Sequence, residues 1–256
     1  MTPQALLSLL LVSISSVGPQ MPRFEVKTAR PSCPPGSEMA GCACEEDSHG
    51  LDILCERTDQ AGIVRLRNSV RHHISSLKLY DLSASLTHLP AWLFYNISLS
   101  NLAVARSHIK DVDEDLFVGV EHSLLTLSFQ HSQLTYVPRG INKITSLKSL
   151  DLQGNNISEL YPYSFYGASI AHLNLGHNTV ITLSENAFLG LEGNLKSLNL
   201  KSNMFKSFPM SAVRNLQNLE ELNLGKMIIH ICLQIFSVTS LNFYFNYCSA
   251  ASLFWK

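Results

Sequence analysis

The feature that most constrains this chain is a pattern of leucines and other apolar residues that recurs every 23 to 25 residues. In the clearest copy, residues 147–160, Leu150 and Leu152 flank a single polar position. This alternation predicts a short strand with its leucines on one face. One unit cannot bury its apolar side chains alone, so neighbouring units must stack. The sequence therefore predicts a solenoid.

Further copies match this one in register along most of the chain. They cover residues 77–94, 99–117, 124–137, 170–188, 195–208 and 219–224. Strands pack closer together than the segments that return between them, so the stack bends with its sheet concave. We expect an α/β solenoid of six to seven repeats over residues 63–226, with short parallel strands on the concave face and loops and short helical turns on the convex face.

A polar residue follows each strand where the chain turns inward. It is Asn155, Asn178 or Asn203 in three repeats and Ser107 or Ser132 in two earlier ones. A side-chain amide can satisfy backbone groups that leave the sheet ladder, and a hydroxyl offers fewer bonds. We expect these residues to form a structural ladder that is weaker at the serines.

Six cysteines fall into two groups. Cys232 and Cys248 lie near the carboxyl end, whereas Cys33, Cys42, Cys44 and Cys55 cluster before the first repeat. The cluster lacks paired C-x-x-C spacing, which favours two disulfides over a zinc site. Spacing alone leaves three pairings open. We expect residues 21–62 to form a disulfide-bonded cap over the end of the core.

The spacing Cys-x8-Cys-x-Cys-x10-Cys, followed by L-x-x-L-x-L-x-x-N repeats, resembles the amino-terminal cap of extracellular leucine-rich-repeat proteins. The resemblance covers about residues 33–226. It implies that the first cysteine pairs with the third and the second with the fourth, hence Cys33 with Cys44 and Cys42 with Cys55. Within such a cap, residues 50–55 are expected to form the edge strand.

A narrower resemblance rests on Cys33-Pro-Pro-Gly, Cys42-Ala-Cys44 and residues 50–56. These segments look like those of secreted arthropod leucine-rich-repeat proteins, a group similar to the non-catalytic subunit of the decapod shrimp luciferase. This resemblance implies an alternative function, a non-catalytic accessory subunit that stabilises a secreted enzyme.

Both ends of the chain differ from the repeats. Residues 1–20 carry an apolar stretch followed by small residues. This pattern favours a signal peptide rather than a short buried segment of a folded domain. The sequons at Asn96 and Asn156 then become candidate glycosylation sites. Residues 227–256 form an atypical apolar tail with three interpretations: an incomplete or alternatively spliced product, a membrane anchor, or a makeshift cap. The expected location is extracellular, or the cell surface if the tail is an anchor.

The chain lacks the sequence signatures of zinc proteases, serine hydrolases and nucleotide-binding proteins. We therefore expect no enzyme activity and no cofactor, and we interpret the scattered histidines as surface residues rather than metal ligands. The acidic run at residues 110–115 fits a solvated loop better than a calcium loop. The net charge of −1 disfavours nucleic-acid binding.

The strand pattern assigns the side chains that face outward from the concave sheet, and these are the candidate partner contacts. The central outward position is expected to hold Tyr80, Ala103, Ser128, Asp151, Asn174, Asn199 and Asn223, flanked by Gln130, Gln153, His172, Lys201 and Glu221 among others. This polar face can hydrogen-bond a protein or glycan, although it has few aromatic and arginine anchors. We expect a secreted or cell-surface recognition or adhesion module.

Overall fold

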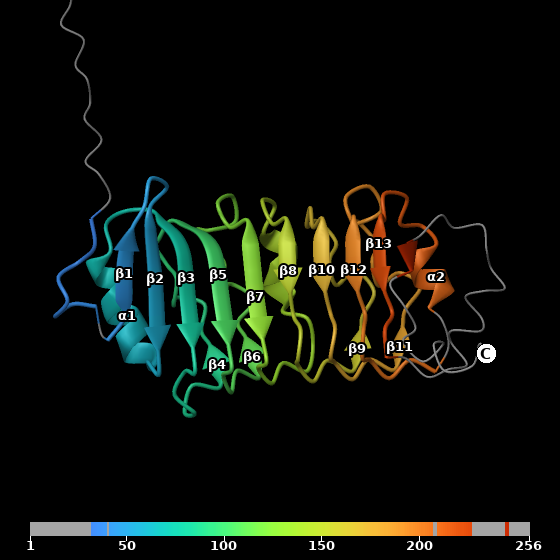
Figure 1. Cartoon of the computed structure of the whole chain (residues 1–256), viewed down its shortest axis with the longest axis horizontal. Helices are drawn as coiled ribbons and strands as arrows, with labels where there is room; N and C mark the ends of the chain where they lie inside the picture. Colours follow the sequence, from blue (N-terminus) through green and yellow to red (C-terminus); the bar gives the residue numbers. More distant parts are fainter. Residues whose placement is uncertain (1–31, 40, 207–208, 227–243, 246–256) are drawn as a thin grey trace, which may run out of the picture. The chain divides into compact units, whose positions relative to one another are not determined.

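The structure is a computed structural model that describes residues 32–39, 41–206, 209–226 and 244–245. Within these residues the main element is a ten-stranded sheet, parallel throughout except for its first pair (Figure 1). Its strands, in spatial order, are β1 (Ala43–Glu46), β2 (Leu51–Glu56), β3 (Ile74–Tyr80), β5 (Leu99–Ala105), β7 (Thr126–Gln130), β8 (Ser149–Asp151), β10 (His172–Asn174), β12 (Ser197–Asn199), β13 (Glu221–Asn223) and β14 (Tyr244–Phe245).

Short elements occupy the returning segments. Two pairs of two-residue strands run along the lower edge of the sheet in Figure 1. They are β4 (His88–Leu89) with β6 (Asp111–Val112), and β9 (Glu159–Leu160) with β11 (Thr182–Leu183). The described helical segments are α1 (Gln60–Ser69), the 3-10 helix η1 (Arg139–Lys143) and α2 (Met210–Val213). The chain folds as the predicted solenoid of short parallel strands with few helices.

The leucine period sets the register of the sheet. The first leucine of each L-x-L unit lies beside its counterpart in the next strand, which forms one buried row: Leu77, Leu102, Leu127, Leu150, Leu173, Leu198 and Leu222. Beneath the strands lie buried phenylalanines, and the rings of Phe165 and Phe188 stack with centroids 6.1 Å apart. Stacking of whole repeats therefore builds one continuous core.

The polar residue after each strand ties neighbouring repeats together. Asn155 Nδ2 donates to the carbonyls of Phe129 and Leu152, and its Oδ1 accepts from the backbone N–H of Leu134. Asn178 and Asn203 make the equivalent contacts.

At the two serine positions the contacts are fewer. Ser107 accepts one bond from Leu82 and donates one to Ala105, while the hydroxyl of Ser132 donates to Gln130 at 3.5 Å. The hydroxyls therefore supply fewer or longer bonds than the amides do.

The cap has the pairing that the resemblance implies, with disulfides Cys33–Cys44 and Cys42–Cys55. The expectation that residues 50–55 form the edge strand is wrong. They form most of β2, and the antiparallel β1 covers its outer side. The short polar sequence of β1 has little strand character of its own, and disulfides at both Cys44 and its neighbour Cys42 hold it in place.

Helix α1 runs across the expected boundary between the cap and the first repeat, which was placed between residues 62 and 63. The division of the chain into a cap and repeats at this point stays a prediction. Asp59 caps the helix by accepting from the backbone N–H of Gly62 at 2.8 Å, and Ile63 and Leu66 are buried. The cap and the first repeat therefore share one core.

The expected signal peptide lies outside the described residues, as does most of the tail. Within the tail, the backbone of β14 pairs in parallel with β13. None of the described helices is long and apolar enough to cross a membrane.

Candidate binding face

The side of the ten-stranded sheet that points away from the core is here called the outward face. The predicted contact residues belong to its strands, except Gln153 and Lys201, which lie two residues beyond the ends of β8 and β12. One assignment needs correction: Tyr80 does not occupy the central position, because Lys78 pairs with Ala103 and Tyr80 pairs with Ala105. In every other repeat the central residue lies between the two residues of the L-x-L unit, and in β3 the residue between Leu77 and Leu79 is Lys78. Tyr80 follows that unit and lies two residues further along the strand.

Six of the twelve predicted contacts named above come together in one depression of about 290 Å³ over β8, β10, β12 and β13. They are Asp151, His172, Asn174, Asn199, Glu221 and Asn223, and the hydroxyls of Ser149 and Ser197 join them. The depression does not include Tyr80, Ala103, Ser128, Gln130, Gln153 or Lys201.

Side-chain amides along this face bond to one another from strand to strand. Asn199 Nδ2 donates to Asn174 Oδ1 at 2.8 Å, and Asn174 Nδ2 donates to Gln153 Oε1 at 3.0 Å. Gln130 Nε2 donates to a carboxylate oxygen of Asp151 at 2.6 Å. We call this set the outer amide ladder. It fixes the orientation of the side chains before any partner binds.

The oxygens of the same residues also accept from their own backbone two residues onward. Asp151 accepts from Gln153, Asn174 from Gly176, and Asn199 from Lys201, at 2.9 to 3.0 Å. A recurrent Asp or Asn at this position was visible in the sequence, but its bonding was not predicted. These side chains have a structural role in addition to any role in recognition.

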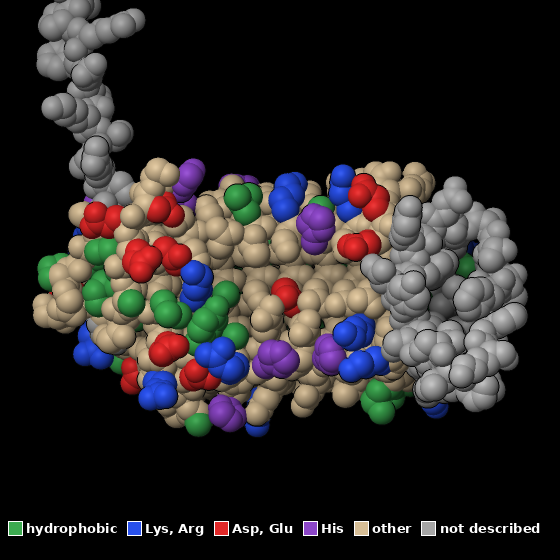
Figure 2. Space-filling view, in the orientation of Figure 1, with side chains coloured by type: hydrophobic (Ala, Val, Ile, Leu, Met, Phe, Trp, Pro, Cys, Tyr) green, Lys and Arg blue, Asp and Glu red, His purple; other side chains and the backbone are tan. Residues whose placement is uncertain are grey.

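The amino-terminal part of the outward face has a different chemistry. Hydrophobic, acidic and basic side chains gather there, whereas the middle of the face consists mostly of uncharged polar groups and backbone (Figure 2). The guanidinium of Arg106 lies 4.9 Å from the centre of the Tyr80 ring and binds both carboxylate oxygens of Asp81. These hydrogen bonds lower the pKa of Asp81 and raise that of Arg106. The ring of Tyr80 therefore packs against Arg106, whose ion pair with Asp81 was not predicted from the sequence.

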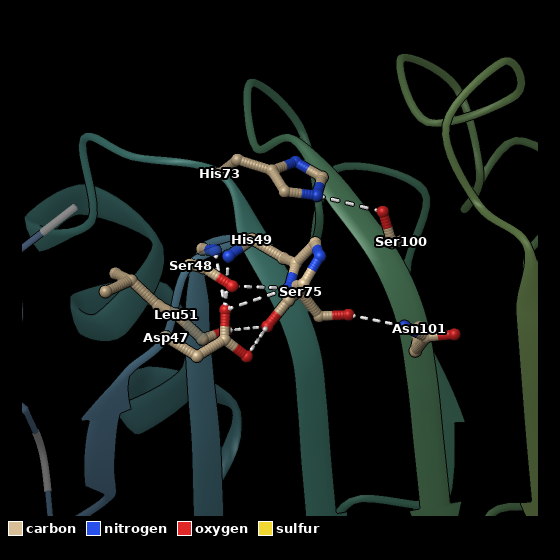
Figure 3. Close-up of polar contacts among 9 residues, drawn as sticks. Asp47, Ser48, His49, Leu51, His73, Ser75, Ser100 and Asn101 are labelled. Carbon is tan, nitrogen blue, oxygen red and sulfur yellow. Dashed lines mark hydrogen bonds and ion pairs between the residues drawn. The ribbon is translucent and has the colours of Figure 1, made fainter. Parts of the chain in front are cut away.

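Serine, histidine and aspartate side chains meet at the upper ends of β2, β3 and β5 (Figure 3). Asp47 accepts from the backbone N–H groups of His49 and Gly50, which lowers the pKa of its carboxyl. The arrangement is not that of a catalytic triad, because the same atom of His49, Nδ1, faces both Ser48 and Asp47.

The second histidine of this cluster, His73, bridges the hydroxyls of Ser98 and Ser100. The side chain of Asn101 donates to the backbone carbonyl of Ser75. The hydroxyl of Ser75 donates in turn to the backbone carbonyl of Leu51. Together these contacts connect the ends of neighbouring strands.

Comparison with known proteins agrees with this geometry. A family model described as leucine rich repeat matches residues 97–157 and 145–193. The chain carries leucine-rich repeats. It is similar to leucine-rich repeat-containing protein 3B of Danio rerio, with 37% identity over 94 residues, 36% of each chain.

Two further relatives differ in how much of them is matched. Tsukushi of Xenopus tropicalis is 26% identical over 188 residues, 72% of this chain and 48% of that protein. Human leucine-rich repeats and immunoglobulin-like domains protein 1 is 34% identical over 110 residues, 42% of this chain and 10% of that protein. The matched part is thus less than half the length of each of these three relatives. They support an extracellular type of leucine-rich-repeat protein.

The sequons lie at the surface of the leucine-rich-repeat solenoid. Asn96 and Asn156 are both exposed, so an attached glycan would not disturb the core. Asn96 has a positive φ of 61° and lies two residues after a buried phenylalanine. In other repeats the same position holds Gly119, Gly167 or Gly190, which also have a positive φ. Glycosylation of either residue stays a prediction.

Proposed function

We propose that this chain is a secreted or cell-surface recognition module that binds a protein partner through the outward face, and that it has no catalytic activity of its own. The observation that carries the proposal is the outer amide ladder beside the depression over β8 to β13. Side chains that are already oriented lose little conformational entropy when a partner binds. The predicted glycan sites lie away from the depression, so they leave it accessible.

Two features support an extracellular location. Both disulfides of the cap require an oxidising compartment to persist. The relatives named above also favour the extracellular type of repeat. The alternative of an accessory subunit rests on the arthropod resemblance alone.

The partner is expected to be a protein rather than a nucleic acid. The depression brings together one carboxylate from Asp151, one from Glu221 and the uncharged amides between them, so it offers hydrogen-bond donors and acceptors without a positive field. A partner surface with complementary polar groups fits this arrangement, and a glycan carried by the partner fits it equally well.

The test replaces two small outward residues by large ones. Ser128→Trp with Ser197→Trp places bulk on the face while leaving the amides in position, and Gln217→Trp adds the same ring at an exposed loop as a matched control. The full chain, displayed as a tetramer, is screened against an array of purified extracellular proteins.

We expect the double variant to bind the partner found with the wild type at least tenfold more weakly, with an unchanged melting temperature, whereas the control binds normally. Equal binding by the double variant and the wild type would refute use of this face.

A further inference from the structure

A second groove lies at the lower edge of the solenoid, away from the outward face. Its volume is about 1010 Å³, and it spans four consecutive repeats. Residues from β4 and β6 form one side, and the segment after β9 forms the other. Figure 1 shows that these short strands follow the edge of the sheet in two separate pairs. The groove lies in the gap between the pairs.

Pro138 accounts for the end of the row of short strands after β6. In the first pair, the backbone N–H of Asp113 donates to the carbonyl of Leu89 in the preceding repeat at 2.9 Å. Counting from the buried residues Val112 and Val137, Pro138 takes the position of Asp113 in the next repeat. Proline has no N–H to donate, so the row of strands cannot continue there. The chain forms the 3-10 helix η1 instead.

Tyrosine side chains line this gap. Tyr136 lies within it, and its hydroxyl donates to Asp111 across the repeats. Tyr161 and Tyr163 stand at the far side with 60% and 56% of their surface exposed. Tyr166 packs edge-on against Tyr163 with ring centroids 6.1 Å apart, so the pair has a defined orientation. Large exposed aromatic side chains are costly in water and are typical of binding hot spots.

The charge of the groove is predominantly negative. Its lining carries the carboxylates of Asp111, Asp113 and Glu114 against the one guanidinium of Arg139. Glu114 is already paired with Lys143 at 3.3 Å. No ion pair engages Asp113 among the described residues, and its carboxylate accepts a hydrogen bond only from the nearby backbone N–H of Asp115 there. Asp113 is therefore available to a cation from outside.

We propose that this groove is a second binding surface, one that takes an extended basic segment of a protein partner, with an arginine placed between Asp113 and the rings of Tyr161 and Tyr163. A guanidinium stacks on aromatic rings and binds carboxylates with two parallel hydrogen bonds, so both walls of the groove suit it. This surface is separate from the outward face and does not depend on the function proposed above.

The test uses the full chain and a fluorescent ten-residue peptide of alternating arginine and serine. A control peptide of the same length has glutamate in place of arginine. Fluorescence anisotropy should detect binding of the arginine peptide only, weakened by added salt. Tyr161→Ala with Tyr163→Ala should raise Kd at least tenfold, and Asp113→Asn at least threefold. Tyr95→Ala removes an equally exposed tyrosine elsewhere and should leave Kd unchanged.

A second measurement does not depend on the folding of the variants. A photoreactive group on the arginine peptide should crosslink to residues 111–114 or 161–164 of the wild type, as mapped by mass spectrometry. Crosslinks on the strands of the outward face, binding of the glutamate peptide with equal affinity, or unchanged Kd in well-folded tyrosine variants would overturn the proposal. The Ser128→Trp and Ser197→Trp variant should bind the arginine peptide normally, which separates this surface from the other.

Discussion

Asn155 and Leu134 belong to neighbouring repeats, and the side-chain oxygen of Asn155 accepts a hydrogen bond of 3.1 Å from the backbone N–H of Leu134. The same side chain donates to the carbonyls of Phe129 and Leu152. Asn155 is only 3% exposed, so water cannot replace these contacts. One amide thus satisfies the backbone of two repeats where the strand ends.

Asn155→Ala should therefore destabilise the chain far more than Ser132→Ala. The first change leaves buried backbone groups without partners and should lower the free energy of unfolding by about 2–4 kcal/mol. Ser132 makes one long bond at 3.5 Å, so its loss should cost less than about 1 kcal/mol. Urea denaturation of both variants measures the difference. Equal losses would show that the amide contacts contribute no more than the hydroxyl.

The cap should act locally. Replacing both Cys42 and Cys55 by alanine opens a loop whose ends are 13 residues apart in sequence, which should cost about 3 kcal/mol. Repeats in a solenoid interact mainly with their neighbours. Hydrogen exchange should therefore accelerate in β1, β2 and β3 and stay slow in β8 and β10. Uniform acceleration along the sheet would contradict a local role.

The leucine period was sufficient to predict the solenoid and the buried row of each strand, because every repeat contributes the same residue types at the same spacing. Tyr80 was misplaced because it was taken as the central residue, although the residue between Leu77 and Leu79 is Lys78, as the pairing of Lys78 with Ala103 confirms. Residues 50–55 were mispredicted as the edge strand, since the polar sequence of β1 does not resemble a strand and β1 was not foreseen.

The groove could not be predicted because its parts are far apart in the sequence. Tyr161 and Asp113 come together only when the repeats stack. Pro138 was a visible signal, since a proline in a strand position ends the row of hydrogen bonds. Its consequence required knowing which residue of the preceding repeat it faces.

Asn96 can lose its sequon without loss of stability. Its φ of 61° lies in the left-handed region, where Gly119, Gly167 and Gly190 also lie in other repeats. Asn96→Gly should therefore keep the melting temperature, whereas Asn96→Gln, which also removes the sequon, should cost about 1 kcal/mol. If Asn96 carries a glycan in the wild type expressed in a secretory host, both variants should run on a gel at an apparent mass that is smaller by one glycan. Equal stability of the two variants would show that the backbone relaxes there.

The contact between Tyr136 and Asp111 should give the chain a distinct loss of stability at high pH. Hydrogen bonding to Asp111, with a further contribution from burial, raises the pKa of Tyr136 from 10.0 to about 12. The hydrogen bond of the protonated hydroxyl stabilises the fold fully below pH 10, and this contribution is lost as the pH rises towards 12. Tyr136→Phe removes the titrating hydroxyl, so the variant should be less stable than the wild type at pH 8.

The variant should also lose less stability than the wild type between pH 10 and pH 12. Asp111 gives the opposite dependence at low pH. Burial raises the pKa of its carboxyl, but the bonds from Tyr136 and the backbone of Val112 outweigh burial and lower the pKa below 3.8. Its contribution is thus present above pH 4 and lost in stronger acid. Melting temperatures of the wild type, Tyr136→Phe and Asp111→Asn across both ranges measure these effects, and parallel profiles for all three proteins would refute the assigned contact.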